Sequence, residues 1–250
     1  SNTGFARVYQ WNGKQWVQLG NDITGSSGER MGRPLGISGD GLVIVVGERG
    51  TGNNFIYKIY TLSGSSWSLR DTINDNNTGN LDINENGTID FSYDGSIFAF
   101  SHGRGGSNNR GDARIFEWNN TNYVQKGGDI VGDLDNSYLG SGWNGINLSK
   151  DGKRIVVGLR SHSSNNGLVR VYDWDGSSWT QVGGDINDPG GRSHNFGSSV
   201  SISNDGQTII AGAPLVDNDI GRVHIFSYEL ISGTASWTYK ATIDGANNGD

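Results

Sequence analysis

Apolar and polar residues alternate along this chain in short runs that end at turn-forming residues. Residues 199–203 alternate, a turn follows at 204–206, residues 208–211 are mostly apolar, and residues 223–228 alternate again. A period of two residues is typical of a half-buried β-strand, and a short apolar run suits a strand covered on both faces. No window of a dozen residues places apolar positions at helical spacing. The pattern therefore predicts an almost entirely β structure.

The same unit recurs along the chain. A Ser-x-Asp-Gly turn occurs at Ser38, Ser92, Ser149 and Ser203. A hairpin of the Arg-Val-Tyr-x-Trp type occurs five times, and its basic or histidine position falls at Arg7, Lys58, Arg114, Arg170 and His224. A period of roughly 50 residues that contains four strands is typical of the blades of a β-propeller.

We therefore predict one all-β domain over residues 1–250, a β-propeller of four-stranded antiparallel blades. Each blade is numbered outward from its Ser-x-Asp-Gly strand. Four complete blades are expected at about 35–74, 88–131, 142–187 and 196–245, and residues 1–24 form the outer half of a fifth. Outer strands without inner ones expose a ladder edge and an apolar face. We expect flanking sequence or a neighbouring copy to supply the missing strands.

The amino-acid composition limits the classes of partner and of binding site that this chain can have. The chain has 250 residues with 41 glycines and 25 aromatic residues (8 Trp, 9 Tyr and 8 Phe), which suits many short strands joined by tight turns. Its net charge of -7 argues against nucleic acid as a partner. The absence of cysteine excludes disulfides and thiolate metal sites, and no apolar run reaches membrane-spanning length. The first residues are Ser-Asn, from which we expect a removed leader or an excerpt of a longer protein.

Three motifs carry a family resemblance. The Ser-x-Asp-Gly turn, Gly212-Ala213-Pro214 and the Gly-Arg-Val-His-Ile-Phe run that begins at Gly221 together resemble FG-GAP repeats, the blades of integrin-like propellers. The hairpins resemble tandem copies of such repeats in large secreted and surface proteins. The resemblance covers nearly the whole chain and implies an extracellular or cell-surface location, but a propeller scaffold hosts many functions.

The resemblance also implies a calcium loop of the form Asp-x-Asp-x-Asp-Gly at the first turn of a blade. Serine replaces the central carboxylate in every copy of this chain, so an isolated loop is expected to bind calcium weakly. Asp90 and Asp94 are the best candidates. The alternative is that each serine and aspartate caps its own turn. No other cofactor is expected.

Loop lengths predict where a ligand would bind. In an up-and-down blade, the second turn and the crossing to the next blade share one face, and the longer loops of this chain all fall there. Loops on a rigid scaffold often carry binding sites. Trp143 could stack on a sugar or a partner side chain, or pack against the next blade. The candidate ligand-binding residues on this long-loop face are Arg104, Asn108, Asn109, Trp143, Arg192, His194, Asp217 and Asp219.

Two kinds of short motif in this chain could be functional or could have arisen by chance. The tripeptide Arg110-Gly111-Asp112 is known from integrin ligands, but such strings arise readily by chance in a glycine-rich chain. Asn-x-Ser/Thr sequons permit glycosylation if the protein is secreted. Asn147 falls on an inner strand and is a poor acceptor, and the glycosylation candidates are Asn76, Asn86 and Asn119.

Catalytic motifs are missing from the sequence. The four histidines lack metal-ligand spacing, and neither a nucleophile elbow nor a phosphate loop occurs. We therefore predict a non-enzymatic extracellular propeller for adhesion or structural assembly, joined into a tandem array or filament through the incomplete first blade. Its partners would be another protein or further copies of itself. The alternatives are a carbohydrate-binding propeller that uses the long-loop face and, third, a glycan-processing enzyme.

Overall fold

Strands make up nearly all the regular structure of the chain. The computed structural model describes residues 3–26, 28, 31–49, 55–75, 87–191, 194–216 and 220–246. Within these ranges the only helical segments are one 3-10 turn, η1 (Ser107–Asn109), and one short helix, α1 (His162–Asn165). The predicted all-β class is confirmed.

Most strands form four antiparallel sheets, in which consecutive strands are neighbours. Sheet A contains β5 (Leu35–Ile37), β6 (Val43–Arg49), β7 (Phe55–Ser63) and β8 (Ser66–Asp75). Sheet B contains β9 (Ile89–Phe91), β10 (Ile97–His102), β11 (Asp112–Trp118) and β12 (Tyr123–Gln125), with β13 (Ile130–Val131) also paired to β11. Sheet C contains β14 (Ile146–Leu148), β15 (Arg154–Gly158), β16 (Val169–Trp174) and β17 (Trp179–Gln181). Sheet D contains β18 (Ser199–Ile202), β19 (Thr208–Ala213), β20 (Arg222–Ile231) and β21 (Thr234–Asp244).

The first residues form only the outer part of such a sheet. Strand β1 (Phe5–Ala6) pairs with β4 (Ile23–Thr24), and β2 (Tyr9–Trp11) pairs with β3 (Trp16–Gln18). We call these four strands the N-terminal half-sheet. Its register repeats that of the complete sheets, because Trp11 opposes Trp16 as Trp174 opposes Trp179.

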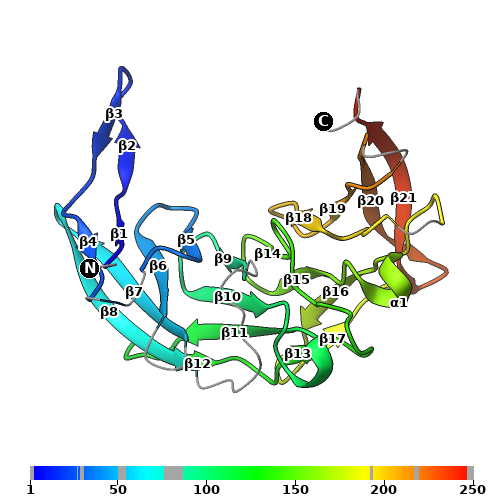
Figure 1. The fold of residues 1–250 in the computed structure, drawn as a ribbon, viewed down its shortest axis with the longest axis horizontal. Helices are drawn as coiled ribbons and strands as arrows, with labels where there is room; N and C mark the ends of the chain where they lie inside the picture. Colours follow the sequence, from blue (N-terminus) through cyan, green and yellow to red (C-terminus); the bar gives the residue numbers. More distant parts are fainter. Residues whose placement is uncertain are drawn as a thin grey trace.

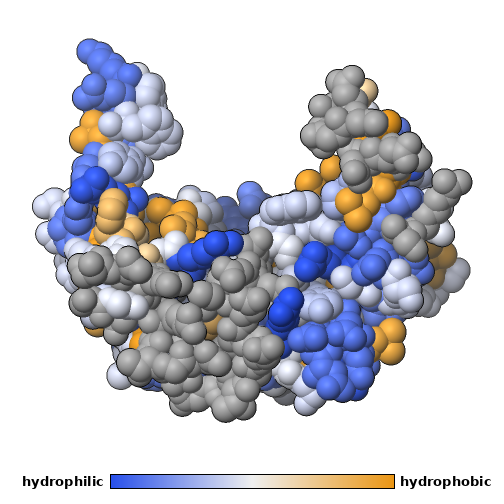
Figure 2. Space-filling model, in the orientation of Figure 1, coloured by the Kyte–Doolittle hydropathy of each residue, from blue (hydrophilic) through white to orange (hydrophobic). Residues whose placement is uncertain are grey.

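The sheets follow one another along an open arc (Figure 1). The half-sheet stands at one end and sheet D at the other, and the space-filling view shows the same hollow between them (Figure 2). The innermost strands β5, β9, β14 and β18 line the concave side (Figure 1). The strand that carries the Ser-x-Asp-Gly turn is therefore innermost in every sheet, as the sequence pattern predicts.

The Ser-x-Asp-Gly turns are closed by their own side chains. In sheet A the Ser38 hydroxyl donates to Asp40 Oδ1 at 2.6 Å, and the same oxygen accepts the Leu42 N–H at 2.9 Å. The Ser38 hydroxyl also accepts the Val43 N–H at 3.0 Å. The three other copies repeat this arrangement. Local hydrogen bonds therefore account for these residues, as the turn-capping alternative proposes.

The core is divided among the junctions between neighbouring sheets. At the junction of sheets A and B, the buried Tyr57 ring stacks on Phe100 with ring centroids 4.2 Å apart, and Ile59 and Phe98 belong to the same cluster. Separate buried clusters lie at the other junctions. Each sheet therefore buries its faces only against its neighbours, as in other repeat proteins.

Candidate functional site

An aromatic anchor is repeated at the junctions between sheets. The indole N–H of Trp67 donates to the carbonyl of Leu19 in the half-sheet at 2.8 Å. The equivalent bonds run from Trp179 to the carbonyl of Lys126 at 2.7 Å and from Trp237 to the carbonyl of Val182 at 3.1 Å. Each anchor thus binds the outermost strand region of the preceding sheet.

The half-sheet carries the same anchor without a neighbour. Trp16 occupies the register position of Trp237, but its exposed fraction is 67% against 8% for Trp237. Tyr9 and Trp11, which lie beside it, are exposed as well. This end of the arc therefore presents the aromatic half of a junction.

An ion pair is repeated at two of the junctions between sheets. Arg114 reaches Asp75 of the preceding sheet at 2.6 Å and Asp129 of its own sheet at 3.1 Å. Arg170 is bound in the same way, by Asp133 of the preceding connection at 2.8 Å and by Asp185 at 2.7 Å. The hydrogen bond from Arg170 holds the pKa of Asp133 below its ordinary value. Carboxylates from two successive repeats thus clamp one arginine.

At the N-terminal end of the arc, half of that clamp is present. Arg7 pairs with Asp22 of the same half-sheet at 2.7 Å. The hydrogen bond from Arg7 lowers the pKa of Asp22 to about 2.

The opposite end of the arc exposes apolar positions that are buried elsewhere. In sheet C, Val169 opposes Ile186, and both are buried against sheet D. In sheet D, Val223 opposes Ile243 in the same register, and Ile243 is 61% exposed. Apolar residues are visible along this end in Figure 2. The two ends of the arc therefore expose opposite sides of the same kind of junction.

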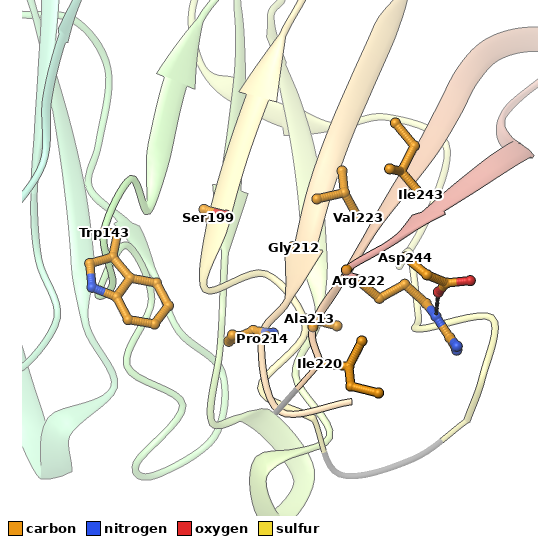
Figure 3. A pocket seen from close by; sticks show the side chains of 12 residues that line it. Trp143, Ser199, Gly212, Ala213, Pro214, Ile220, Arg222, Val223, Ile243 and Asp244 are labelled. Atoms are coloured by element: carbon orange, nitrogen blue, oxygen red, sulfur yellow. Dashed lines mark hydrogen bonds and ion pairs between the residues drawn. The ribbon is translucent and has the colours of Figure 1, made fainter. Parts of the chain in front are cut away.

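A cavity of about 310 Å³ opens on this face of sheet D, and we call it the terminal socket. In Figure 3 Val223 and Ile243 lie on one side, Pro214 and Ile220 lie below them, and Trp143 stands apart at the edge. The Arg222 guanidinium donates to Asp244 at its rim. The socket is mainly apolar, with one ion pair beside it.

A second, polar cavity of about 720 Å³ lies among the long loops, and we call it the polar basin. Asp135 accepts hydrogen bonds from Asn108 and Arg110, each at 3.0 Å. Left-handed backbone is concentrated around it, at Asn108, Asn109, Asn136, Tyr138, Ser163, Ser164 and Asn165. Such strain gathers at sites where loops are held for function. The basin is lined by Arg110, Asp133, Leu134, Asp135, Asn136, Tyr138, Ser161, Ser163, Ser164 and Asn165.

The structure separates the residues that the sequence places on one face. Asn108 and Asn109 hold the loop beside the polar basin, and the half-buried Arg104 lies 6.0 Å from the Tyr138 ring centroid. Trp143 is 74% exposed and lines the other cavity together with residues of sheet D.

The four remaining predicted site residues do not belong to either cavity as the structure describes it. His194 is half-buried, and its Nδ1 lies 3.3 Å from Asp188. Arg192, Asp217 and Asp219 lie outside the described residues.

Sequence reasoning missed Asp135 and Tyr138, which join the basin from the connection between sheets B and C. The length of that connection was the available signal. It also missed the terminal socket, because no single repeat contains it.

One sequence hypothesis is wrong. The tripeptide Arg110-Gly111-Asp112 is not available to a receptor, because Asp112 is only 2% exposed and lies 3.3 Å from His102 Nδ1. Arg110 is already paired with Asp135. The left-handed Gly111 carries the chain into the interior, which places the aspartate in the core.

The calcium candidates have other partners. Asp90 Oδ2 accepts hydrogen bonds from the Asn147 amide and the Leu148 N–H, both at 2.6 Å, and burial raises the pKa of Asp90. Asp94 Oδ1 accepts the Ser92 hydroxyl and the Ser96 N–H. Across the part of the chain that the structure describes, no three metal-ligating side chains gather. Asp90 thus links two innermost strands.

Among the glycosylation candidates, Asn119 is exposed on a turn, and its side-chain oxygen accepts the Thr121 N–H at 2.9 Å. Asn76 and Asn86 lie outside the described residues. Asn147 is held between Asp90 and the Ile202 N–H, so its side chain is already bonded. Among the described helices, none is long and apolar enough to cross a bilayer.

No family model matches this sequence, and no curated protein sequence matches it significantly. Solved structures share its fold. A Bacteroides fragilis protein provisionally named a 6-phosphogluconolactonase aligns with a TM-score of 0.60 at 17% identity, over 96% of this chain and 65% of that one. Kluyveromyces lactis Hsv2 aligns with a TM-score of 0.56 at 12% identity, over 98% and 71%. A hypothetical selenium-binding protein from Sulfolobus tokodaii aligns with a TM-score of 0.54 at 13% identity, over 81% and 52%.

These structures are propeller-like all-β proteins. This chain has a propeller-like fold. At such low identity the likeness shows the fold alone, and this chain spans about half to two thirds of the length of two of these three proteins. The resemblance to FG-GAP repeats stays a prediction.

Proposed function

We propose that this chain is a non-enzymatic, extracellular structural module of four blades and a half blade that assembles end to end with further copies of itself. One observation carries the proposal: positions that are buried or half-buried at the internal junctions are exposed at the two ends, as Trp16 and Ile243 show. The half-sheet of one copy would dock on sheet D of the next. The module would then serve adhesion or the building of a filament.

The contact would reuse interactions present inside the chain. Trp16 would reach the outermost strand β21 as Trp237 reaches Val182, and its ring would leave water. Burial of one tryptophan removes roughly 150–250 Å² from water, whereas a stable interface buries about 800 Å² on each partner. Tyr9 and Trp11 on one side and Ile243 on the other would contribute to the remainder.

Analytical ultracentrifugation tests the proposal through the two ends separately. We expect concentration-dependent association of the chain, lost in Trp16→Asp and in Ile243→Asp. The matched control is Leu230→Asp, at an exposed position near the end of β20. A mixture of the first two variants should stop at a one-to-one dimer, since each retains one intact end. A chain that stays monomeric at high concentration, or association that neither variant weakens, would reject end-to-end assembly.

A carbohydrate-binding function is the second candidate, and the polar basin favours it. Its serine hydroxyls, carboxylates and asparagine amides can bond the hydroxyl groups of a sugar, and Tyr138 offers a half-buried ring. A glycan array should then show binding that Asp135→Ala abolishes. Loss through Trp143→Ala alone would place the sugar at the terminal socket, and silence across the array would reject the function.

A further inference from the structure

A buried apolar residue followed by glycine is a second feature that the junctions share. Three segments that lead into a new sheet are described, and they place Met31, Leu139 and Phe196 against the preceding sheet. All three side chains are buried, and a glycine with positive φ follows each one. The positive φ explains the glycine, because other residues rarely adopt that conformation.

The sheet that receives this residue has a fixed construction. The amides of Met31, Leu139 and Phe196 donate to the carbonyls of Thr3, Arg110 and Asn166 at 3.2, 2.9 and 3.2 Å. Each carbonyl precedes a left-handed glycine, at Gly4, Gly111 and Gly167. A Cβ on any of these glycines would lie within about 2.3 Å of the docked backbone. Glycine is therefore required because another main chain lies directly on it.

The floor of each site is a row of residues in fixed register. Under Phe196 the row is Gly158, Val169 and Ile186, and under Leu139 it is Ser101, Ala113 and Ile130. The first member of each row touches the glycine that follows the apolar residue. The Ser101 hydroxyl donates to the carbonyl of Gly140 at 2.8 Å. A Cβ added to Gly158 would lie 1.9 Å from the carbonyl oxygen of Gly197. This row selects a glycine at the second docked position.

Sheet D repeats every part of this site. Its row is Gly212, Val223 and Ile243, and its left-handed glycine is Gly221, which follows Ile220. The Gly245 N–H donates to the Gly221 carbonyl at 3.1 Å, as the Gly132 N–H donates to the Gly111 carbonyl at 3.0 Å. These residues line the terminal socket (Figure 3).

We propose that the terminal socket binds an extended peptide segment in which a large aliphatic or aromatic residue is followed by glycine. The apolar side chain fills the cavity over Val223 and Ile243. Its amide donates to the Ile220 carbonyl, and the glycine lies against Gly212. This inference rests on the proposed function and adds the chemistry of the partner: a segment that leads into another blade of this repeat.

A peptide with the sequence of residues 194–203 of this chain tests the inference, because it carries Phe196, Gly197 and the strand that follows. It is titrated into the full chain and followed by NMR and by the chain's tryptophan fluorescence, since the peptide itself contains no tryptophan. We expect saturable one-to-one binding that shifts the signals of Gly221 and Ile243. Peptides with Phe196→Ser or Gly197→Val should bind at least tenfold more weakly.

Variants of the chain locate the peptide. Ile243→Asp should weaken binding at least tenfold, whereas Leu230→Asp should leave it unchanged, and unaltered circular dichroism confirms that both fold. Trp16→Asp should still bind the peptide, because it changes only the opposite end. Peptide binding by a chain that never self-associates would uphold the socket and reject end-to-end assembly. No saturable binding up to millimolar peptide, or binding indifferent to Gly197→Val or to Ile243→Asp, would overturn the inference even if the chains assemble.

Discussion

Trp237 and Trp16 occupy one repeat position in two environments, so their truncation measures what a junction contributes to stability. Trp237 is 8% exposed, donates to the Val182 carbonyl and meets the Tyr228 ring at a centroid distance of 5.5 Å. Removal of such a side chain costs about 3–5 kcal/mol of unfolding free energy. For a chain of this size that corresponds to a fall in Tm of roughly 6–20 °C.

Trp16→Ala should be nearly neutral in a dilute monomer. Trp16 is 67% exposed, and its ring contacts the exposed Trp11 at a centroid distance of 5.8 Å. We expect a loss of about 0.5 kcal/mol or less, as for most exposed positions. Trp237→Phe is the control that keeps a ring but removes the indole donor, and it should lose at least the roughly 1 kcal/mol of one hydrogen bond.

Equilibrium urea unfolding at low protein concentration, monitored by circular dichroism, compares the three variants. The reasoning requires Trp237→Ala to shift the midpoint strongly and Trp16→Ala to leave it almost unchanged. Equal losses would show that the half-sheet buries its anchor within one chain. That result would remove the exposed junction on which the proposed assembly depends.

Three further predictions concern the interior. Asp75→Asn should lower the unfolding free energy by about 1.5–3 kcal/mol in urea titrations, because it removes the charge of one of the two carboxylates that clamp the half-buried Arg114; a loss below about 0.5 kcal/mol would contradict this. Burial lowers the pKa of His224, so the unfolded chain binds a proton more readily than the folded one and stability should fall as the pH drops below about 6.5. His224→Asn should show a smaller loss of Tm between pH 7.5 and 5.5, and an identical pH profile would refute the assignment. Gly167→Ala should be far more destabilising in thermal melts than Gly176→Ala, since both have positive φ but only Gly167 lies against the Phe196 backbone; equal losses would show that backbone strain alone decides.

The sequence by itself determined the strands, their order and their turns. Alternation and short apolar runs are properties of a few consecutive residues, and the Ser38 and Asp40 side chains close their turn with bonds that span at most five positions. Such local interactions can be read from any single repeat. The number of outer hairpins and the half-sheet at residues 5–24 follow from counting the copies.

Only the tertiary structure decided which residues are available to a partner. The long loops could be read from the sequence. The sequence could not show that Asn108 bonds a residue of one cavity while Trp143 lines another, or that Asp112 is buried. These sites combine side chains from adjacent repeats, which lie tens of residues apart in the chain. Trp16 and Trp237 occupy the same register position in their hairpins, yet one faces water and the other lies in a junction. Their difference arises from the presence of a neighbouring sheet, because burial depends on what packs against a residue and not on the residue alone.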